Sequence, residues 1–320
     1  MMMNTDGNST SNNSSSGGND STTNDAVFKK LFPKKYFCKC ISNKQRMDTR
    51  NFDAIRGLDV QVDTISTADS SATITIGTTT VVVGIKVEIT EPSINEPSNG
   101  FLEVNVNMTP FCGLRHEFGK SSDEALAMAE FTRRTLVESK IFDLQDLCIE
   151  EHKSVWTIHV DCVCLSDGGS IIDAVLVGSG MALSRLVLPA LVLSPTNQLV
   201  RVDKNEISTM FDNDNNETLN GKTSIKSHGK KLPVSSIPIP LTFGVFNYND
   251  KKIVLADPCD EEEPMLESTF TVVCFLNRND LSIYKQGGAG INVEIMNKAF
   301  DISKKRYDQI AGLESVQSVQ

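Results

Sequence analysis

The sequence predicts an α+β fold made of two halves, each a run of strands followed by a helix, with one buried helix at the centre. The first observation is the segment 154–164, in which apolar and polar residues alternate as in a half-buried strand. The second is the segment 171–186, which follows the turn Asp167-Gly168-Gly169 and is apolar nearly all round. The third is a repeat of the same order, strands and then a helix, between residues 237 and 312.

Two features of the apolar helix predict how it begins and what packs against it. Either Ser170 or Asp173 is expected to cap its N-terminus. Gly178 and Gly180 lower its helix propensity, so we expect them where another element packs closely against the helix. This helix and the strand before it therefore form the core that the other segments cover.

The remaining elements follow from alternation, turn residues and helix caps. Strands are expected at 58–66, 72–76, 80–89 and 101–108 in the first half, and at 240–247, 252–257, 267–276 and 281–285 in the second. Gly77-Thr78-Thr79 is expected to turn a hairpin. Helices are expected at 121–139, which opens on the capping-box pattern Ser121-Ser122-Asp123-Glu124, and at 291–312.

Composition divides the chain into five segments. Residues 1–25 form a low-complexity tail that is expected to be disordered, and residues 26–50 form a basic, amphipathic arm. The two halves occupy 51–202 and 233–320, and 203–232 is a polar inserted or disordered loop. Because Pro33 interrupts any helix in the arm, we expect the arm to dock on its own domain or a neighbour rather than on a membrane surface.

Charge and cysteine content limit the classes of function. The net charge of −10 over 320 residues excludes a protein that grips nucleic acid with its whole surface, so any such contact is a local basic patch. No apolar run is long enough to span a bilayer and no signal peptide is visible, so we expect a soluble, intracellular protein. Cys162 and Cys164 lie on an apolar strand face and Cys274 lies in a second apolar run, so we expect reduced core thiols rather than disulfides. No metal site or cofactor is predicted.

Six sequence blocks in the same order resemble the ring subunits of the eukaryotic RNA exosome, which are members of the RNase PH family. The blocks are FKKLFPKKYF…RMDTR, STADSSATITIGTTTVVVGIK, LVESKIFDLQDLCI, KSVWTIHVDCVCLSDGGSIIDA, ADPCDEEE and KQGGAG. The resemblance covers roughly residues 28–312, apart from the insertion. It implies an RNase PH-like fold, also described as ribosomal protein S5 domain 2-like.

Active members of this family are phosphorolytic 3′–5′ exonucleases, in which arginines hold the attacking phosphate. The resemblance places Arg134 on the helix that supplies such arginines, but Glu130 and Val137 stand at flanking positions that are often arginine. After the glycine turn Ser170 is kept, whereas the phosphate-binding arginine is replaced by Ile171. A branched alkyl group cannot bind phosphate, so the resemblance implies that the chain is not an enzyme.

Two carboxylates of the family pattern remain, Asp257 and Glu263. One interpretation is a surviving metal or acid–base site. The favoured interpretation is an acidic, solvated loop, because further carboxylates stand between them. Hydrolysis in place of phosphorolysis stays open at this point.

The candidates for RNA contact lie in the loop before the helix at 121–139. The resemblance places this loop toward a central pore, so Arg115, His116 and Lys120 are predicted to contact RNA, with Lys285 as a weaker candidate. The alternative is that these side chains pair with acidic residues of a neighbouring subunit.

These observations favour a non-catalytic structural subunit of an exosome ring, which guides RNA through the pore during rRNA processing and mRNA turnover. The expected partners are other RNase PH-like ring subunits, S1/KH-type cap subunits and single-stranded RNA, with no membrane. The expected locations are nucleus, nucleolus and cytoplasm. The alternatives are an active phosphorolytic exoribonuclease and a stand-alone RNA-binding module that uses the basic arm.

Overall fold

The computed structural model describes residues 27–110, 112, 122–193, 199–202, 225–227, 229–249, 251–275 and 281–317. The chain divides into two units, Met1–Asn51 and Phe52–Gln320, which are described separately. Among the described residues, every helix is too short or too polar to cross a lipid bilayer.

The first unit contains the basic arm. Residues 27–31 are helical, Phe32 leaves helical geometry at φ −135°, and α2 (Pro33–Ser42) begins with the proline. Proline is tolerated in the first turn because its missing N–H would have no helical acceptor there. The predicted interruption is therefore confirmed, and helix resumes immediately after it. The Lys35 ammonium lies 5.1 Å from the centre of the Phe32 ring, a cation–π contact.

The first half of the second unit is a curved sheet. Its strands are β1 (Leu58–Val62), β2 (Ser70–Ile76), β3 (Thr79–Thr90), β4 (Phe101–Met108), β5 (Cys148–Glu150) and β6 (Ser154–Ser166). They are ordered β1-β2-β3-β6-β4, with β5 also on β6, and only the β4–β6 pair is parallel. The predicted hairpin joins β2 to β3, and Gly77 supplies the positive φ of 59° that its turn requires. The parallel pair needs a crossover, which α3 (Asp123–Glu138) and the short 3-10 helix η1 (Leu144–Leu147) provide.

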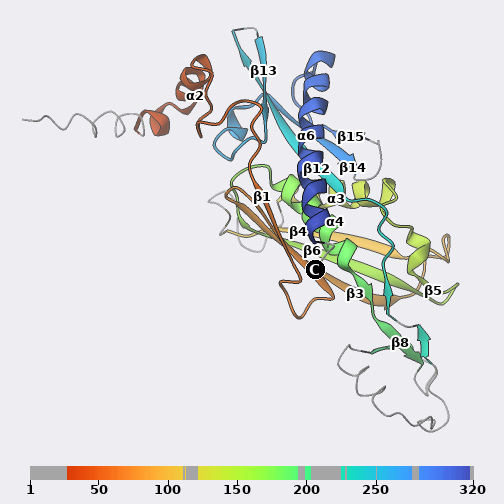
Figure 1. The fold of residues 1–320 in the computed structure, drawn as a ribbon. Coiled ribbons are helices and arrows are strands. Elements are labelled where there is room, and N and C mark those ends of the chain that lie inside the picture. Colours follow the sequence, from red (N-terminus) through yellow and green to blue (C-terminus); the bar gives the residue numbers. More distant parts are fainter. Residues whose placement is uncertain are drawn as a thin grey trace, which may run out of the picture. The chain divides into compact units, whose positions relative to one another are not determined.

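Two helices cover one face of this sheet (Figure 1). The first, α3 (Asp123–Glu138), is capped by the Ser122 hydroxyl, which accepts from the N–H of Ala125. Its buried residues are Ala125, Met128, Ala129, Phe131, Thr132, Thr135 and Leu136. The second, α4 (Ile171–Arg185), is the predicted central helix, and nearly all of its residues are buried.

The two glycines of α4 mark close contacts on opposite sides of the helix, as predicted. A Cβ atom at Gly178 would lie 2.7 Å from the Val83 side chain on β3. A Cβ atom at Gly180 would lie 2.8 Å from the Pro238 ring on β12 (Pro238–Tyr248). The helix is therefore packed between the first sheet and the second.

The second half repeats the order of strands and then a helix. β12 (Pro238–Tyr248), β13 (Lys251–Ala256), β14 (Ser268–Phe275) and β15 (Leu281–Tyr284) form an antiparallel sheet in the order β13-β12-β14-β15, with the 3-10 helix η2 (Glu263–Met265) between β13 and β14. The final helix α6 (Val293–Gln317) packs on β12 and β14 through an apolar cluster that includes Phe243, Phe270 and Ala299. The predicted α+β fold of two halves around one buried helix is confirmed.

The region between the halves differs from the prediction. Strands β7 (Val187–Leu188), β8 (Ala190–Leu193) and β9 (Leu199–Val202) follow α4, and β10 (Ile225–Ser227) and β11 (Lys230–Lys231) lie within the segment predicted as a loop. β10 pairs with β8 and β11 with β7, so backbone hydrogen bonds order residues that the polar composition placed in a loop. Residues 203–224 lie outside the described part of the chain.

Candidate functional site

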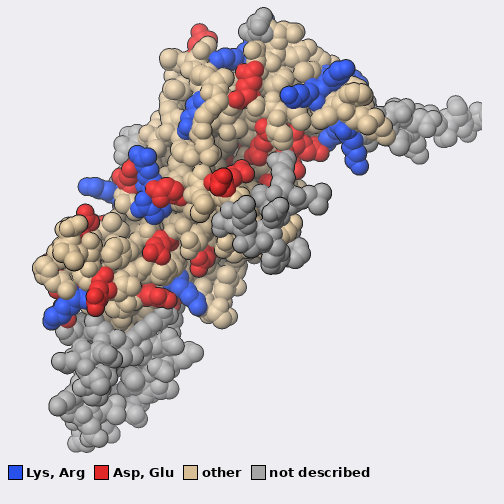
Figure 2. Space-filling model, turned by 180° about the vertical axis from the view of Figure 1, so that it is seen from behind, with Lys and Arg blue, Asp and Glu red and all other residues tan. Residues whose placement is uncertain are grey.

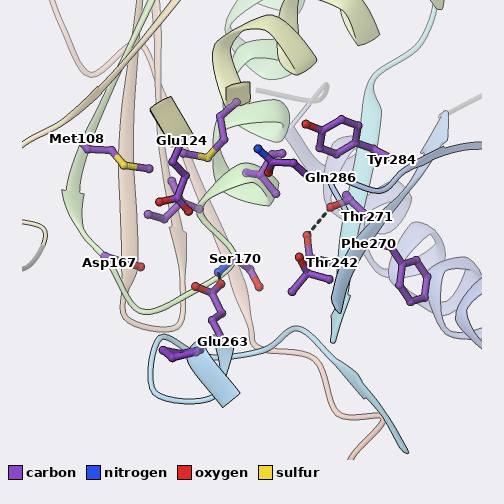
Figure 3. Close-up of a pocket in the computed structure, with 15 residues that line it drawn as sticks. Met108, Glu124, Asp167, Ser170, Thr242, Glu263, Phe270, Thr271, Tyr284 and Gln286 are labelled. Carbon is purple, nitrogen blue, oxygen red and sulfur yellow. Dashed lines mark hydrogen bonds between the residues drawn. The ribbon is translucent and has the colours of Figure 1, made fainter. Parts of the chain in front are cut away.

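A cavity of about 330 Å³ lies where the N-terminus of α4 faces the second sheet. It is bordered by the end of β4, the starts of α3 and α4, the strands β12, β14 and β15, and the connection from β13 to β14. Figure 3 shows Glu124 reaching into it from α3 and Glu263 reaching toward Ser170 from the opposite side. This is the region in which the family resemblance places phosphate chemistry.

The N-terminus of α4 is already occupied by a carboxylate of the chain itself. The backbone N–H of Ser170 donates to Glu263 Oε1 at 2.8 Å. The positive end of a helix is the position at which phosphate binds in many proteins. Glu263 therefore uses the N–H of the N-cap residue and places a negative charge at this helix end, which disfavours a phosphate there.

The backbone at this N-terminus is unusual because Ser170 has a left-handed conformation with φ 54°. The Ser170 hydroxyl was one of the two predicted helix caps, but it makes no capping hydrogen bond. It donates instead to the carbonyl oxygen of Pro258 at 3.0 Å. Gly169, with φ 90°, packs so closely on the β13–β14 connection that a Cβ atom would lie 2.5 Å from the Asp260 backbone nitrogen. The glycine turn and this connection thus hold each other in place.

The Arg56 guanidinium lies against this turn, and each of its five N–H groups donates a hydrogen bond. It donates to both carboxylate oxygens of Asp257 at 2.6 and 2.9 Å, to the carbonyl oxygens of Gly168 and Gly169 at 2.6 and 2.9 Å, and to the Thr79 hydroxyl at 3.3 Å. A guanidinium has five N–H donors, so none remains for a phosphate. Burial works against the charge of Arg56, but Asp257 more than offsets it and the pKa of Arg56 is raised.

The interpretation of 257–263 as an acidic, solvated loop is wrong for Asp257 and Glu262, whereas Glu261 is exposed and Asp260 and Glu263 are half-buried. Asp257 is 1% exposed and Glu262 is buried completely. Besides Arg56 Nε and Nη2, the backbone N–H of Arg56 donates to Asp257 at 2.8 Å. An ion pair between positions far apart in the chain compensates the buried charge, which no local pattern of acidic residues reveals. The bonds that Asp257 makes to Arg56 favour a structural role over that of a metal ligand.

Asp173, in the first turn of α4, links the two halves. Its carboxylate accepts from the backbone N–H and the hydroxyl of Thr242 on β12, at 2.9 and 2.7 Å. The Thr242 hydroxyl also lies 2.8 Å from that of Thr271 (Figure 3). Burial raises the pKa of Asp173 to about 7, because desolvation disfavours its charged form more than the two hydrogen bonds favour it.

The arginine that the family pattern retains does not line the cavity. Arg134 Nε donates to Glu138 at 2.7 Å, and both side chains are exposed on α3. Glu130 forms a bidentate pair with Arg133, at 2.8 and 2.9 Å. Ile171 is 8% exposed and borders the cavity with its alkyl side chain. Of the residues that the structure places around the cavity, none is a lysine, an arginine or a histidine.

The predicted RNA contacts have different outcomes. Arg115, His116 and Lys120 lie outside the described residues, so their role stays a prediction. The Lys285 ammonium donates to the carbonyl oxygens of Gly287 and Gly288, the second at 3.1 Å. On the face shown in Figure 2, basic side chains occur singly or in small groups among acidic ones, with no continuous basic field.

The described cysteines are free thiols. Cys162, Cys164 and Cys274 are buried, as the apolar strand face and the second apolar run predicted, and burial raises the pKa of Cys162 to about 12. Within the described residues, no group of three or more His, Cys, Asp or Glu side chains is arranged to hold a metal ion.

The contributions of Arg56 and Glu263 to this site were not predicted. Arg56 contacts a residue 201 positions away, and the Ser170–Glu263 bond spans 93 positions. The sequence Ile55-Arg56-Gly57, just before the first strand, contains no pattern that predicts either contact. The family pattern did point to Glu263, but as a partner of Asp257 rather than of the α4 N-terminus.

Two family descriptions match the chain. Residues 54–189 match the 3′ exoribonuclease family, domain 1, and residues 236–306 match domain 2 of that family. The chain is 29% identical over 282 residues to "Exosome complex component rrp43" of Schizosaccharomyces pombe, which covers 88% of this chain and 95% of that protein. It is 28% identical over 273 residues to "Exosome complex component Rrp42" of Methanopyrus kandleri, with 83% and 89% covered.

Solved structures show the same fold. A chain of the Archaeoglobus fulgidus exosome with RNA bound to the active site matches with a TM-score of 0.70 at 24% identity, over 89% of this chain and 98% of that one. The six sequence blocks are most similar to those of the ring subunit known as ribosomal-RNA-processing protein forty-three, and the match to the Schizosaccharomyces protein confirms that similarity. The two matched domains together span about two thirds of the sequence, and the chain belongs to the RNase PH-like 3′ exoribonuclease family.

Proposed function

We propose that this chain is a non-catalytic structural subunit of an RNA exosome ring. The proposal rests on the residues found at the position where a phosphate would bind in an active enzyme of the family. Glu263 accepts the Ser170 N–H at the α4 N-terminus, and Ile171 stands where the family pattern has an arginine. A phosphate entering there would meet a carboxylate and an alkyl group, so phosphorolysis is disfavoured at its first step.

Exposed apolar side chains on edge strands support assembly with other chains. β4 and β15 each end the strand order of a sheet, and they expose Phe101, Leu281 and Ile283. An exposed apolar edge strand is a template for pairing with another chain. In an assembled ring these edges would be covered by neighbouring RNase PH-like subunits, which explains why the isolated chain leaves them open.

The same proposal assigns a path for RNA and a set of partners. Arg115, His116 and Lys120 would face a central pore and contact phosphates of single-stranded RNA, while S1/KH-type subunits would cap the ring. The chain would then act in rRNA maturation and mRNA turnover, in the nucleus, the nucleolus and the cytoplasm. Its role is to complete the ring and to guide RNA to a nuclease carried by another chain.

Two alternatives make different predictions. An active phosphorolytic exoribonuclease needs a phosphate site, and the arrangement of Glu263 and Ile171 disfavours it. A stand-alone RNA-binding module would use the basic arm at 26–50, and its affinity for RNA would fall steeply as salt rises. The net charge of −10 disfavours such a module, since only the arm is strongly basic.

Phosphate-dependent release of nucleoside diphosphates from single-stranded RNA tests the proposal. The purified chain is assayed with magnesium, first alone and then assembled with its ring partners. We expect no release from the chain alone and stable incorporation into a six-membered ring. Release by the purified chain that requires phosphate would contradict the proposal.

Asp257→Ala is a poor probe in this assay, because loss of the Arg56 ion pair disturbs the fold as well as any chemistry. Ile171→Glu is the better variant, since it adds a negative charge at the cavity border without removing a side-chain hydrogen bond. Activity that survives it would exclude the α4 N-terminus as the phosphate site. RNA binding by the isolated chain, lost on removal of residues 26–50, would favour the stand-alone module instead.

A further inference from the structure

We propose that Cys112 and Cys164 form a redox-sensitive thiol pair, which closes to a disulfide when hydrogen peroxide is present. Both thiols are free in the structure, and they lie where β4 ends beside β6. Neither cysteine borders the cavity. The proposed structural role in a ring needs no thiol chemistry, so this inference goes beyond that role and does not depend on it.

A tight turn after β4 carries Cys112 back onto β6. Met108, the last residue of β4, pairs with Cys164 in the parallel register of the two strands. The backbone N–H of Cys112 then donates to the carbonyl oxygen of Thr109 at 2.9 Å, which closes a β-turn. The Thr109 hydroxyl holds this turn on β6, because it donates to the carbonyl oxygen of Cys164 at 3.0 Å. Strand pairing and the turn together therefore place Cys112 on Cys164.

The two cysteines are in direct contact. Cys112 Sγ donates to the carbonyl oxygen of Cys164 at 2.7 Å. The two thiols also hydrogen-bond each other, and burial and then this bond raise the pKa of Cys164. A disulfide needs the two Cα atoms no more than about 7 Å apart and the two Cβ atoms about 4 Å apart. A sulfur that contacts both the carbonyl group and the thiol of the other cysteine is within reach of that geometry.

Cys162 provides the internal comparison. It lies on the same face of β6 as Cys164 and is completely buried. Its sulfur lies 3.6 Å from the Ser179 hydroxyl. Because the contact of Cys162 is a hydroxyl rather than a thiol, burial on this face does not by itself create a pair.

The chemistry has two steps, and Cys112 takes the first. It is 8% exposed, whereas Cys164 is 1% exposed and its raised pKa keeps its thiol protonated, which makes it a poor first nucleophile. Hydrogen peroxide oxidises the Cys112 thiol to a sulfenic acid: an S–O bond forms, the O–O bond breaks and one water leaves.

The second step forms the disulfide. The Cys164 sulfur attacks the sulfenic sulfur of Cys112, so that an S–S bond forms and the S–O bond breaks. The departing hydroxyl takes the Cys164 proton and leaves as a second water. In sum the two thiols lose two electrons, and the peroxide gains them.

Closure would fasten the end of β4 to β6. β4 ends the strand order of its sheet and pairs with β6 alone, so few backbone bonds hold it. Met108, at the end of this strand, borders the cavity (Figure 3). A covalent link across the pair would oppose local opening of this edge strand beside the cavity.

Disulfide mapping of the folded full chain tests the pair. The chain is treated with hydrogen peroxide, unfolded with N-ethylmaleimide to block the remaining thiols, digested without reductant and analysed by mass spectrometry. We expect a peptide pair that links Cys112 to Cys164 and that dithiothreitol releases, while Cys162 is alkylated. This link should form at least about tenfold faster than any other, because thiols already in contact react as if highly concentrated. Oxidation of the chain unfolded in urea should abolish that preference.

Three variants assign the steps. In Cys112→Ser, Cys164 should stay a free thiol, because it is buried and protonated. In Cys164→Ala, the first step still proceeds, so Cys112 should accumulate as a sulfenic acid that dimedone traps. Cys162→Ala is the matched control on the same strand face and should form the link as the unchanged chain does. Absence of the Cys112–Cys164 link, or a main product that joins other cysteines or two chains, would overturn the inference.

Amide hydrogen exchange measures the effect of closure on β4. Oxidation should slow exchange at the end of β4 by about tenfold or more, because the link opposes local opening. The same treatment of Cys112→Ser should leave that exchange unchanged. Faster exchange in the oxidised chain would show that closure distorts β4, and would contradict a pair that the native geometry has already brought together.

Discussion

Arginine meets carboxylate in two very different settings in this protein. The Arg56–Asp257 pair lies beneath the glycine turn, with side chains 10% and 2% exposed. The Arg134–Glu138 pair lies on the outer face of α3, with side chains 66% and 62% exposed. The shortest N–O distances are nearly equal, 2.6 and 2.7 Å, so distance alone does not distinguish the two pairs.

Burial decides what each pair does. A buried ion is costly to leave without its partner, so the Arg56–Asp257 pair holds the first strands, the glycine turn and the second half together. An exposed pair competes with water and salt, so the α3 pairs contribute little to stability. Thus the Arg56 guanidinium has no donor left, and the exposed arginines Arg133 and Arg134 do not line the cavity.

The largest expected effect comes from breaking the buried pair. Arg56→Ala should lower the free energy of unfolding by about 3–5 kcal/mol, because Asp257 is left as an uncompensated buried charge. Urea denaturation followed by circular dichroism measures it. Asp257→Ala should cost a similar amount, and the double variant should cost clearly less than the sum. A loss below about 1 kcal/mol for Arg56→Ala would mean that the pair behaves like a surface pair.

This pair also marks the limit of prediction from the sequence. β4 was predicted to the residue and α3 to within two residues, since alternation and the Ser122 cap are local signals. The burial of α4 and its glycine contacts were also predicted, because an apolar helix has to be covered. The bonds of Arg56 join residues up to 201 positions apart, and no periodicity records which charges meet after folding.

The same limit explains the errors around the cavity. The carboxylates at 257–263 were interpreted as a solvated loop because acidic runs are usually solvated. In the structure, Asp257 accepts hydrogen bonds from Arg56, and Glu263 accepts one from the Ser170 N–H. The strands β7 to β11 were not predicted, because their prolines and polar residues give no strand pattern. Their pairing, β10 with β8 and β11 with β7, is determined by tertiary packing. The alkyl side chain at Ile171, in contrast, is visible in the sequence directly as a residue type, and the structure places it at the cavity border.

Titration of Asp173 is the next largest effect. Its pKa is raised to about 7 in the folded protein by burial, above its ordinary value of 3.8. The folded state therefore retains a proton that the unfolded state has lost between those values. The stability contribution is fully present below pH 3.8 and is lost as the pH rises through about 7. The free energy of unfolding should fall with pH by at most about 1.4 kcal/mol per pH unit across this window.

Asp173→Asn is the matched variant for this titration. An amide can accept from the Thr242 N–H and donate to its hydroxyl, so the variant should fold and should lack this pH dependence. The measurement is the difference in unfolding free energy between the two proteins at several pH values from 4 to 8. Parallel curves would show that Asp173 does not titrate in this range. The other charged groups near it are Asp257, Arg306 and Arg56, which the variant leaves unchanged.

Removal of the carboxylate at the α4 N-terminus should have a smaller effect. Glu263→Ala takes away the acceptor of the Ser170 N–H, and loss of such a helix-end contact costs about 0.5–2 kcal/mol. Glu263→Gln keeps an acceptor and should cost less. Thermal unfolding of the two variants side by side gives the comparison. If Gln is as destabilising as Ala, the negative charge stabilises the helix end more than the hydrogen bond does.

The smallest effect is expected for the exposed pairs on α3. Arg134→Ala should change the free energy of unfolding by about 0.2–1 kcal/mol, and added salt should reduce the change further. Arg133→Ala should behave in the same way, because its partner Glu130 is exposed too. The salt series is the decisive measurement, since screening weakens an exposed pair and barely affects a buried one. If Arg134→Ala and Arg56→Ala lost similar stability at every salt concentration, burial would not be what separates the two settings.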